Sequence, residues 1–318
     1  MSSPESLPTT TCPACPACRA AAPPALGETA GYHARLCSKC AHTFVEDMPS
    51  AETLAAVYAT YGYDEDDLST VPPFIFGILG GVVESFEAYR SAGGRLLDVG
   101  FGVGALLRVA RDAGWTTHGI EASSAAVEQG LRYGLGDLVH GDFLKAEWPA
   151  EHFDVIVMTE LIEHLVEPEP FLRQASRLLR PGGVLYMTTP HGRGVSGRVL
   201  GASWSVLRPP EHLHLYSIAS MREVLRRTGF ARSTVYTQGI LPHEIVTHVR
   251  SRLRRGTAGE AASARLAAEP ANPERVQKSS ALNESVTQSP VGRIAKRVAN
   301  GVLRTTRLGD SLRVYAQR

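Results

Sequence analysis

All five cysteines of the chain lie within its first forty residues. Cys15 with Cys18 and Cys37 with Cys40 form two C-x2-C pairs, and 18 residues separate the pairs. This spacing is typical of structural zinc sites, in which four thiolates hold the ion tetrahedrally and leave no open position for catalysis. Cys12 forms another C-x2-C pair with Cys15, so spacing alone leaves open whether Cys12 or Cys18 completes the site.

A second chemical signal is the segment 96–104 (LLDVGFGVG), which joins an apolar run to an acid and three alternating glycines. The acid is Asp98, and the glycines are Gly100, Gly102 and Gly104. Glycine lets the backbone turn tightly and lets a ligand approach the main chain closely. The segment follows a predicted strand and precedes a predicted helix, which is where open α/β sheets bind ligands.

The same loop is compatible with two cofactors. Glu121 ends the next predicted strand about twenty residues later, where a carboxylate can take both ribose hydroxyls. Gly100, Gly102 and Ala105 also satisfy the dinucleotide pattern G-x-G-x-x-A, so an NAD-dependent dehydrogenase is an alternative interpretation. Asp98, two residues before the first glycine, instead favours a cofactor with an ammonium group over a pyrophosphate.

Two further segments discriminate between these cofactors. Asp142 and Phe143 follow the third predicted strand and offer an acceptor for an adenine amino group beside an aromatic face. The segment 180–183 (RPGG) precedes the fifth predicted strand. Taken with the glycine loop, these segments closely resemble the class I S-adenosylmethionine-dependent methyltransferase family over roughly residues 95–237.

The resemblance implies a Rossmann-like, seven-stranded methyltransferase sheet, S-adenosylmethionine as cofactor, and a role for each matched residue. The implied cofactor residues are Asp98, Gly100, Gly102 and Gly104 for the methionine end, Glu121 for the ribose, Asp142 and Phe143 for the adenine, and Glu160 on the cofactor side. The segment 35–40 (RLCSKC) also resembles the zinc ribbon of related methyltransferases. That likeness favours Cys15, Cys18, Cys37 and Cys40 as the zinc ligands.

The segment 160–164 (ELIEH) follows the fourth predicted strand. It resembles the E-x-x-E-H of quinone-precursor O-methyltransferases, in which acids and histidine hold a divalent cation. This implies a Mg²⁺ site at Glu160, Glu163 and His164, with His164 as a candidate catalytic residue. The alternative is a structural role on the cofactor side.

A second histidine segment, 209–217 (PPEHLHLYS), lies in the loop after the fifth predicted strand. It resembles the Glu-His segment of sugar methyltransferases, in which the histidine is a general base. His212 is the matching residue, and a histidine with a near-neutral pKa suits removal of a hydroxyl proton. The alternative is that Glu211 and His212 only tie the loop to the domain.

These residues need a scaffold, and the chain supplies alternating strands and helices from Arg95 onward, which predicts βαβ units and a parallel sheet. The last strand is expected unusually late. Leu312, Val314 and Ala316 alternate with more polar residues, which predicts a strand within 309–318. The resemblance to class I methyltransferases implies that this strand closes the sheet between its fifth and sixth strands. The predicted domains are a zinc-ribbon-like module at 1–50, a helical lid or linker at 51–90, a cofactor-binding domain at 91–239, a helical or flexible insertion at 240–308, and the final strand at 309–318.

Composition narrows the function classes. The 318 residues carry a formal net charge of +1, which does not predict nucleic acid as a partner. The apolar run at 71–83 is too short to span a bilayer, and residues 1–11 lack the pattern of a signal peptide. We therefore expect a cytoplasmic protein with no transmembrane segment, whose cysteines are metal thiolates rather than disulfides.

The expected activity is S-adenosylmethionine-dependent methyl transfer to a hydroxyl oxygen, with carbon as a second choice, of a small-molecule or sugar-type acceptor. The cofactor carries the chemistry, and the protein supplies alignment and a histidine base. The alternatives are the dehydrogenase above and a non-catalytic module that binds the cofactor without turnover.

Overall fold

The computed structural model describes residues 14–58, 68–240, 245 and 290–318. Cys12 and most of the predicted insertion at 240–308 therefore lie outside the described residues.

Seven strands form one sheet in the order β10-β11-β8-β7-β4-β5-β6. Their bounds are β4 Arg95–Val99, β5 Thr116–Glu121, β6 Asp137–His140, β7 Phe153–Thr159, β8 Leu179–Pro190, β10 Arg232–Gln238 and β11 Ser311–Gln317. Neighbouring strands run parallel, except that β11 is antiparallel to both of its neighbours. The predicted seven-stranded Rossmann-like sheet is confirmed.

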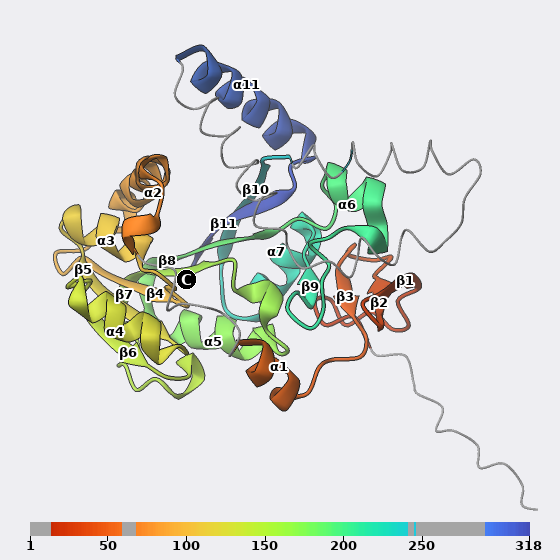
Figure 1. The fold of residues 1–318 in the computed structure, drawn as a ribbon, viewed down its shortest axis with the longest axis horizontal. Helices are drawn as coiled ribbons and strands as arrows, with labels where there is room; N and C mark the ends of the chain where they lie inside the picture. The colour runs from red at the N-terminus through yellow and green to blue at the C-terminus, as the bar shows by residue number, and fades with distance from the viewer. Residues whose placement is uncertain (1–13, 59–67, 241–244, 246–289) are drawn as a thin grey trace, which may run out of the picture.

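Helices cover both faces of this sheet (Figure 1). The helices α2 (Pro73–Glu84), α3 (Ala105–Asp112) and α4 (Ser124–Arg132) pack on one face, and α5 (Pro168–Leu178) and α7 (Ile218–Arg227) pack on the other. Strands covered on both faces need apolar side chains at nearly every position, and the first six residues of β7 are buried accordingly.

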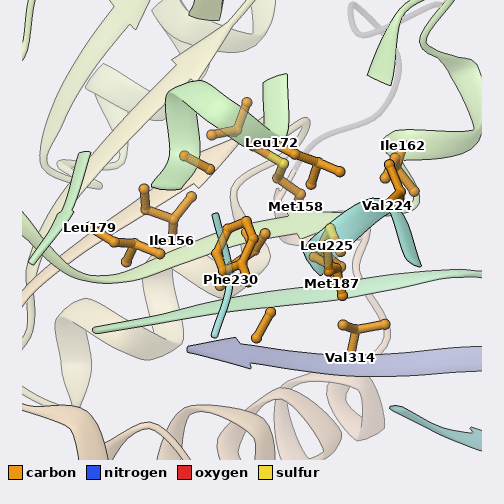
Figure 2. Packing of buried hydrophobic residues seen from close by; sticks show 14 of the residues in the cluster. Ile156, Met158, Ile162, Leu172, Leu179, Met187, Val224, Leu225, Phe230 and Val314 are labelled. Carbon is orange, nitrogen blue, oxygen red and sulfur yellow. The ribbon is translucent and has the colours of Figure 1, made fainter. Parts of the chain in front are cut away.

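The core beneath α5 and α7 joins side chains from six strands of the sheet to those two helices. Figure 2 shows Ile156, Met158 and Met187 of the sheet against Leu172 of α5 and Leu225 of α7. All five side chains are fully buried. This packing holds the carboxyl ends of β4, β7 and β8 in fixed positions relative to one another.

The late final strand forms where the alternation predicted it and takes the place in the sheet that the resemblance implied. In β11, Val314 pairs with Val235 of β10 on one side and with Met187 of β8 on the other. Leu312, Val314 and Ala316 are buried in the same core as α5 and α7. The side chains between them, including Arg313, therefore point to the face that α2 covers.

Strand β8 differs from its prediction. The sequence favoured a helix over 170–179 and a strand over 184–188, whereas α5 ends at Leu178 and β8 already begins at Leu179. Leu179 pairs with Phe153 and Val184 with Val155, so β8 advances five residues where β7 advances two. The segment 180–183 therefore bulges out of the pairing with β7, and Gly182 supplies the positive φ of 77° that this bulge needs.

A second, four-stranded sheet holds the N-terminal module, in the order β1-β2-β3-β9. Its strands are β1 Ala25–Thr29, β2 Tyr32–Leu36, β3 Thr43–Val45 and β9 His214–Leu215. The fourth strand, β9, comes from the loop after β8, so the large domain completes the sheet of the small one.

The remaining described helices are α1 (Ala51–Tyr58), α6 (Val195–Leu200) and α11 (Pro290–Thr306), with short 3-10 turns η1 Leu68–Thr70, η2 Glu87–Tyr89, η3 Phe143–Lys145, η4 Ile162–His164 and η5 Gly201–Ser203. Helix α11 extends away from the sheet beside β10 (Figure 1). Arg304 of α11 stacks on the Tyr236 ring of β10, with 4.1 Å between the guanidinium carbon and the ring centre. No helix within the described ranges has both the length and the apolar character to cross a membrane.

Candidate active site

A cavity of about 280 Å³ opens at the carboxyl ends of the central strands. It lies between α2 and the glycine-rich turn on one side and β7, β8 and β11 on the other. The residues lining it are Ile78, Leu79, Val82, Asp98, Phe101, Val103, Ala105, Leu106, Thr159, Tyr186, Thr188 and Arg313. We call this the cofactor cavity, because it contains the predicted acid and borders the predicted glycine loop.

The glycine loop needs its glycines for backbone reasons. Gly100, Gly102 and Gly104 all have positive φ, at 71°, 53° and 77°. A Cβ atom on Gly104 would also lie 2.3 Å from a methyl carbon of Leu135. The loop therefore turns tightly between β4 and α3, and two neighbouring elements leave no space for a side chain at Gly104.

Asp98 carries the clearest chemical signal in the cofactor cavity. Its side chain is 2% exposed, and its Oδ1 is buried with no hydrogen-bond partner among the described residues. Burial, reinforced by the charge of Glu121, raises its pKa to about 8. A buried carboxylate oxygen without a partner is costly, and a ligand ammonium would satisfy it. The residue therefore fits the cationic methionine end of S-adenosylmethionine.

Glu121 lies across the loop from Asp98, at the end of β5. Its carboxylate accepts hydrogen bonds from the backbone N–H groups of Gly102 (3.1 Å), Ala122 (2.8 Å) and Ser123 (3.2 Å). These bonds fix the carboxylate at the edge of the glycine loop. It keeps acceptor capacity for ribose hydroxyls, because two carboxylate oxygens offer about four lone-pair sites.

The remaining predicted cofactor residues are spread along the same edge. Asp142 is partly exposed and caps η3 by accepting a 2.9 Å bond from the Leu144 N–H. Phe143 is 3% exposed, with its ring 5.6 Å from that of Phe171, so it forms part of the core under the adenine position. Glu160 has an exposed side chain and φ of +48°, and its N–H donates to the Thr188 carbonyl.

The two candidate catalytic histidines meet although 48 positions separate them in the sequence. The rings of His164 and His212 cross edge to face, with 4.5 Å between their centres. Neither is among the residues that line the cofactor cavity. His212 Nδ1 lies 2.7 Å from the Val206 carbonyl, so Nδ1 carries the proton and donates it, which leaves Nε2 as a proton acceptor. Burial lowers the pKa of both histidines, that of His164 to about 4.

The acids near these histidines do not form the predicted magnesium set. Potential ligand atoms of Glu163, His164 and His212 lie within 4.8 Å of one another, and Glu160 is not part of this group. Glu163 is fully buried and accepts a 2.9 Å bond from the Thr189 hydroxyl. Burial and the neighbouring Glu160 raise the pKa of Glu163. In addition, Mg²⁺ prefers oxygen ligands to imidazole. These observations do not support magnesium here.

The four predicted zinc ligands converge at the other end of the molecule. The Sγ atoms of Cys15 and Cys40, and those of Cys18 and Cys37, are each 3.6 Å apart, and all four lie within 4.8 Å of one another. Tetrahedral thiolates about 2.3 Å from a zinc ion are about 3.8 Å apart, so the spacing fits four ligands of one ion. Contact between Cys15 and Cys40 lowers the pKa of Cys15 to about 5 and raises that of Cys40.

Several residues of the cofactor cavity were not predicted. Thr159 and Thr188 sit at the ends of predicted strands, where any residue type is compatible with the pattern, and Tyr186 lies inside the predicted strand over 184–188. Arg313 could have been identified from the sequence. It is a charged residue at one of the polar positions of the alternation in β11, which lies inside the sheet rather than at its edge. Its Nε is buried without a hydrogen-bond partner among the described residues.

With this geometry in view, comparison with known proteins decides the family. A family profile described as "Methyltransferase domain" matches residues 74–234, which is 161 of 318 residues and so just over half of the chain. The chain belongs to the methyltransferase domain family. The matched region runs from α2 into β10 and contains the cofactor cavity except for Arg313.

Curated relatives match shorter parts of the chain. A probable S-adenosylmethionine-dependent methyltransferase of Mycolicibacterium smegmatis is 31% identical over 151 residues, which cover 47% of this chain and 56% of the relative. A ubiquinone biosynthesis O-methyltransferase of a Caulobacter species is 37% identical over 103 residues, covering 30% and 40% respectively. The chain thus spans about half the length of the curated relatives it matches.

Among solved structures, the methyltransferase domain resembles Haemonchus contortus phosphoethanolamine N-methyltransferase 2 in complex with S-adenosyl-L-methionine. The TM-score is 0.51 at 18% identity, over 87% of this chain and 61% of that one. At this identity the likeness concerns the fold alone.

Proposed function

We propose that this protein transfers a methyl group from S-adenosylmethionine to a hydroxyl oxygen of a small-molecule acceptor. One observation carries the proposal: the orphaned carboxylate oxygen of Asp98 in the cofactor cavity, at the carboxyl end of the first sheet strand of a methyltransferase domain. Asp98 and the glycine loop would hold the methionine end, Glu121 the ribose, and Asp142 the adenine. When bound, the cofactor supplies an activated methyl group on a sulfonium.

The acceptor side of the cavity favours a ring or hydrocarbon over a polar sugar. Ile78, Leu79 and Val82 of α2 form one wall, with Tyr186 and Thr188 of β8 opposite. Apolar walls with a few polar groups are typical of small-molecule sites. Curated relatives named ubiquinone biosynthesis O-methyltransferases agree with an aromatic hydroxyl as the acceptor group.

Arg313 indicates that the cavity prefers an acceptor with a negative charge. Strands β7 and β8 separate its strand from β4, so its guanidinium faces the acceptor end of the cavity rather than Asp98. A guanidinium whose Nε has no hydrogen-bond partner within the described ranges is suited to a carboxylate or another anionic substituent. We therefore favour hydroxylated aromatic acids as acceptors.

His212, although outside the lining of the cofactor cavity, is the proposed base for an acceptor that extends from the cavity toward it. With Nδ1 donating to the Val206 carbonyl, Nε2 would take the proton of the acceptor hydroxyl as its oxygen attacks the methyl carbon in line. His164, in edge contact with His212, would keep that ring in place. The competing mechanism, with a metal held by acids and His164, predicts that chelation stops turnover.

We further propose that Cys15, Cys18, Cys37 and Cys40 hold one structural zinc ion. The two short Sγ contacts and the burial of three of the four side chains support this. All four positions of a tetrahedral ion are taken, so the zinc has no part in methyl transfer.

Titration calorimetry with S-adenosylhomocysteine and NADH, followed by transfer of labelled methyl from S-adenosylmethionine to a panel of hydroxylated aromatic acids and sugars, tests the proposal. We expect S-adenosylhomocysteine to bind, NADH not to bind, and labelled aromatic ethers to form. Binding of NADH alone would identify a dehydrogenase. S-adenosylhomocysteine binding with no labelled product from the panel or from cell extract would indicate a non-catalytic module.

A further inference from the structure

A second cavity, of about 310 Å³, lies where the N-terminal module meets the methyltransferase domain. It shares no lining residue with the cofactor cavity. The residues around it are Lys39, Cys40, Ala41, His191, Arg193, Arg198, Ser217, Ile218, Ala219, Arg222 and Arg307. We call it the basic cavity, because Lys39 and four arginines line it and no acid does.

The five cations come from separate parts of the chain. Lys39 belongs to the second cysteine knuckle, Arg193 and Arg198 flank the start of α6, Arg222 lies on α7, and Arg307 follows α11. Folding thus gathers like charges that are distant in sequence, which costs free energy unless a counter-charge is present.

No acid lines the basic cavity in the part of the chain that the structure describes. Arg226 and, more weakly, Lys39 of the cavity lower the pKa of nearby Glu223. None of the five cations forms an ion pair there, and Arg198 Nε donates instead to the Arg193 carbonyl at 2.8 Å. Burial and neighbouring Arg198 lower the pKa of Arg193. Two nearby acids are engaged elsewhere: Asp310 accepts from the Ser196 N–H and hydroxyl, and Glu223 pairs with Arg226.

Backbone donors also face the basic cavity. Helix α7 begins there, and its capping box satisfies the N–H groups of Ser217 and Ser220. The N–H groups of Ile218 and Ala219, both in the cavity wall, have no hydrogen-bond partner among the described residues. The first turn of a helix carries partial positive charge and exposed N–H donors, so it adds to the attraction of the five cations for an anion.

We propose that the basic cavity binds the diphosphate group of a small phosphorylated ligand. Five cations exceed what one phosphate ion neutralises, and the cavity falls within the size range of small-molecule sites. Its limited volume favours a compact ligand over a long polyanion, in agreement with a net charge of only +1. Arginine forks and helix N–H groups are the donors that phosphoryl oxygens prefer.

Titration calorimetry of the full-length, zinc-loaded protein with sodium pyrophosphate tests the proposal. We expect saturable binding at one site that weakens as NaCl rises from 50 to 300 mM. Arg193→Gln and Arg222→Gln should each raise the Kd about tenfold or more, because each removes charge-assisted hydrogen bonds. Arg226→Gln is the matched control. It removes the same charge from α7, but Arg226 lies outside the cavity and pairs with Glu223, so its Kd should match the wild type.

Further titrations identify the source of the diphosphate and test whether another kind of anion is the true ligand. Tighter binding of UDP or ADP than of pyrophosphate would support a nucleotide ligand, whereas equal binding would support recognition of the diphosphate alone. No binding at millimolar pyrophosphate, or equal weakening by Arg226→Gln, would overturn the proposal. So would Arg222-dependent binding of a single-stranded oligonucleotide, or of phosphatidylglycerol vesicles, in a protein that ignores pyrophosphate.

Zinc content, melting temperature and S-adenosylhomocysteine affinity of each variant should match the wild type. The two cavities share no residue, so a protein that fails to bind S-adenosylhomocysteine can still bind pyrophosphate, and the two proposals fail separately.

Discussion

At the scale of single residues, Asp98 links cofactor binding to pH. Its pKa of about 8 means that the carboxyl is largely protonated in the ligand-free protein at neutral pH. A ligand ammonium pairs with the ionised form, so binding releases a proton. The affinity for S-adenosylhomocysteine should therefore increase with pH, with Kd falling by up to about tenfold per pH unit between pH 6 and 8.

Calorimetry in buffers of different ionisation enthalpy measures this released proton directly. Asp98→Asn should abolish the pH dependence and weaken S-adenosylhomocysteine by about 10- to 100-fold. The stability of the folded protein depends on pH in the opposite direction from the affinity. The native carboxyl holds a proton that the unfolded one loses, so ligand-free wild-type protein should lose stability relative to Asp98→Asn as pH rises from about 4 to 8. A pH-independent Kd in the wild type would contradict the assignment of Asp98.

His212 gives a second prediction at this scale. His212→Ala should lower kcat by about 10²- to 10⁴-fold and leave the Kd of S-adenosylhomocysteine unchanged. Burial lowers the pKa of His212 below 6.5, so kcat should rise through that lowered pKa and be level at neutral pH. The sequence alone favoured a near-neutral value, since it cannot show burial. If His164→Ala is more damaging and chelation stops turnover while zinc is retained, a metal-assisted mechanism replaces the base.

At the scale of elements, β11 is expected to be indispensable. Seven of its residues pair with β10 on one side and seven with β8 on the other, so its loss exposes two strand edges and the core face. A chain ending at Leu308 should be insoluble or fail to bind S-adenosylhomocysteine.

Val314→Ala is the milder variant in case the truncated chain cannot be purified. It should cost about 2 kcal/mol of the free energy of unfolding, because it removes two fully buried methyl groups. Ser311→Ala, at the partly exposed start of the same strand, should change stability by less than about 0.5 kcal/mol. Urea denaturation measures both. A soluble truncated protein with an unchanged melting temperature would show that the strand is dispensable.

The sequence predicts those elements whose pattern of apolar residues extends over several consecutive positions. Strand β11 was recoverable because three buried positions alternate over five residues, 312–316, and β4 because an apolar run ends in Asp98 and glycines. Strand β9 was not recoverable, since two residues show no period and His214 is buried against residues distant in sequence, including His42 of the N-terminal module. The basic cavity could not be predicted for the same reason, because its cations are separated in sequence and meet only after folding.

At the scale of the whole molecule, the module and the methyltransferase domain are built as one unit. Besides the β3–β9 pairing, the Ser217 hydroxyl donates to the Cys40 carbonyl at 2.5 Å, and Glu169 bridges Arg19 and Arg227 at 2.8 and 2.7 Å. The second cysteine knuckle is thus hydrogen-bonded to the residue that caps α7.

Removal of the metal should therefore also destabilise the methyltransferase domain. Elemental analysis should find one zinc per chain in the wild type and in Cys12→Ser, but none in Cys37→Ser/Cys40→Ser. The double variant should lose several degrees in the melting transition of the whole protein, because β9 and the start of α7 lose their neighbour. Protein purified metal-free under reducing conditions, or an unchanged melting curve in the double variant, would argue against structural zinc.

The position of β11 also affects the protein while it is being made. Residues 239–310, 72 in number, are translated after β10 and before β11. At about 5–20 residues per second this takes roughly 4–14 s, during which β8 and β10 have no strand between them. Exposed strand edges invite pairing with other chains. Synonymous slow codons in this stretch should therefore lower the soluble yield, while the protein purified from that strain has an unaltered melting temperature.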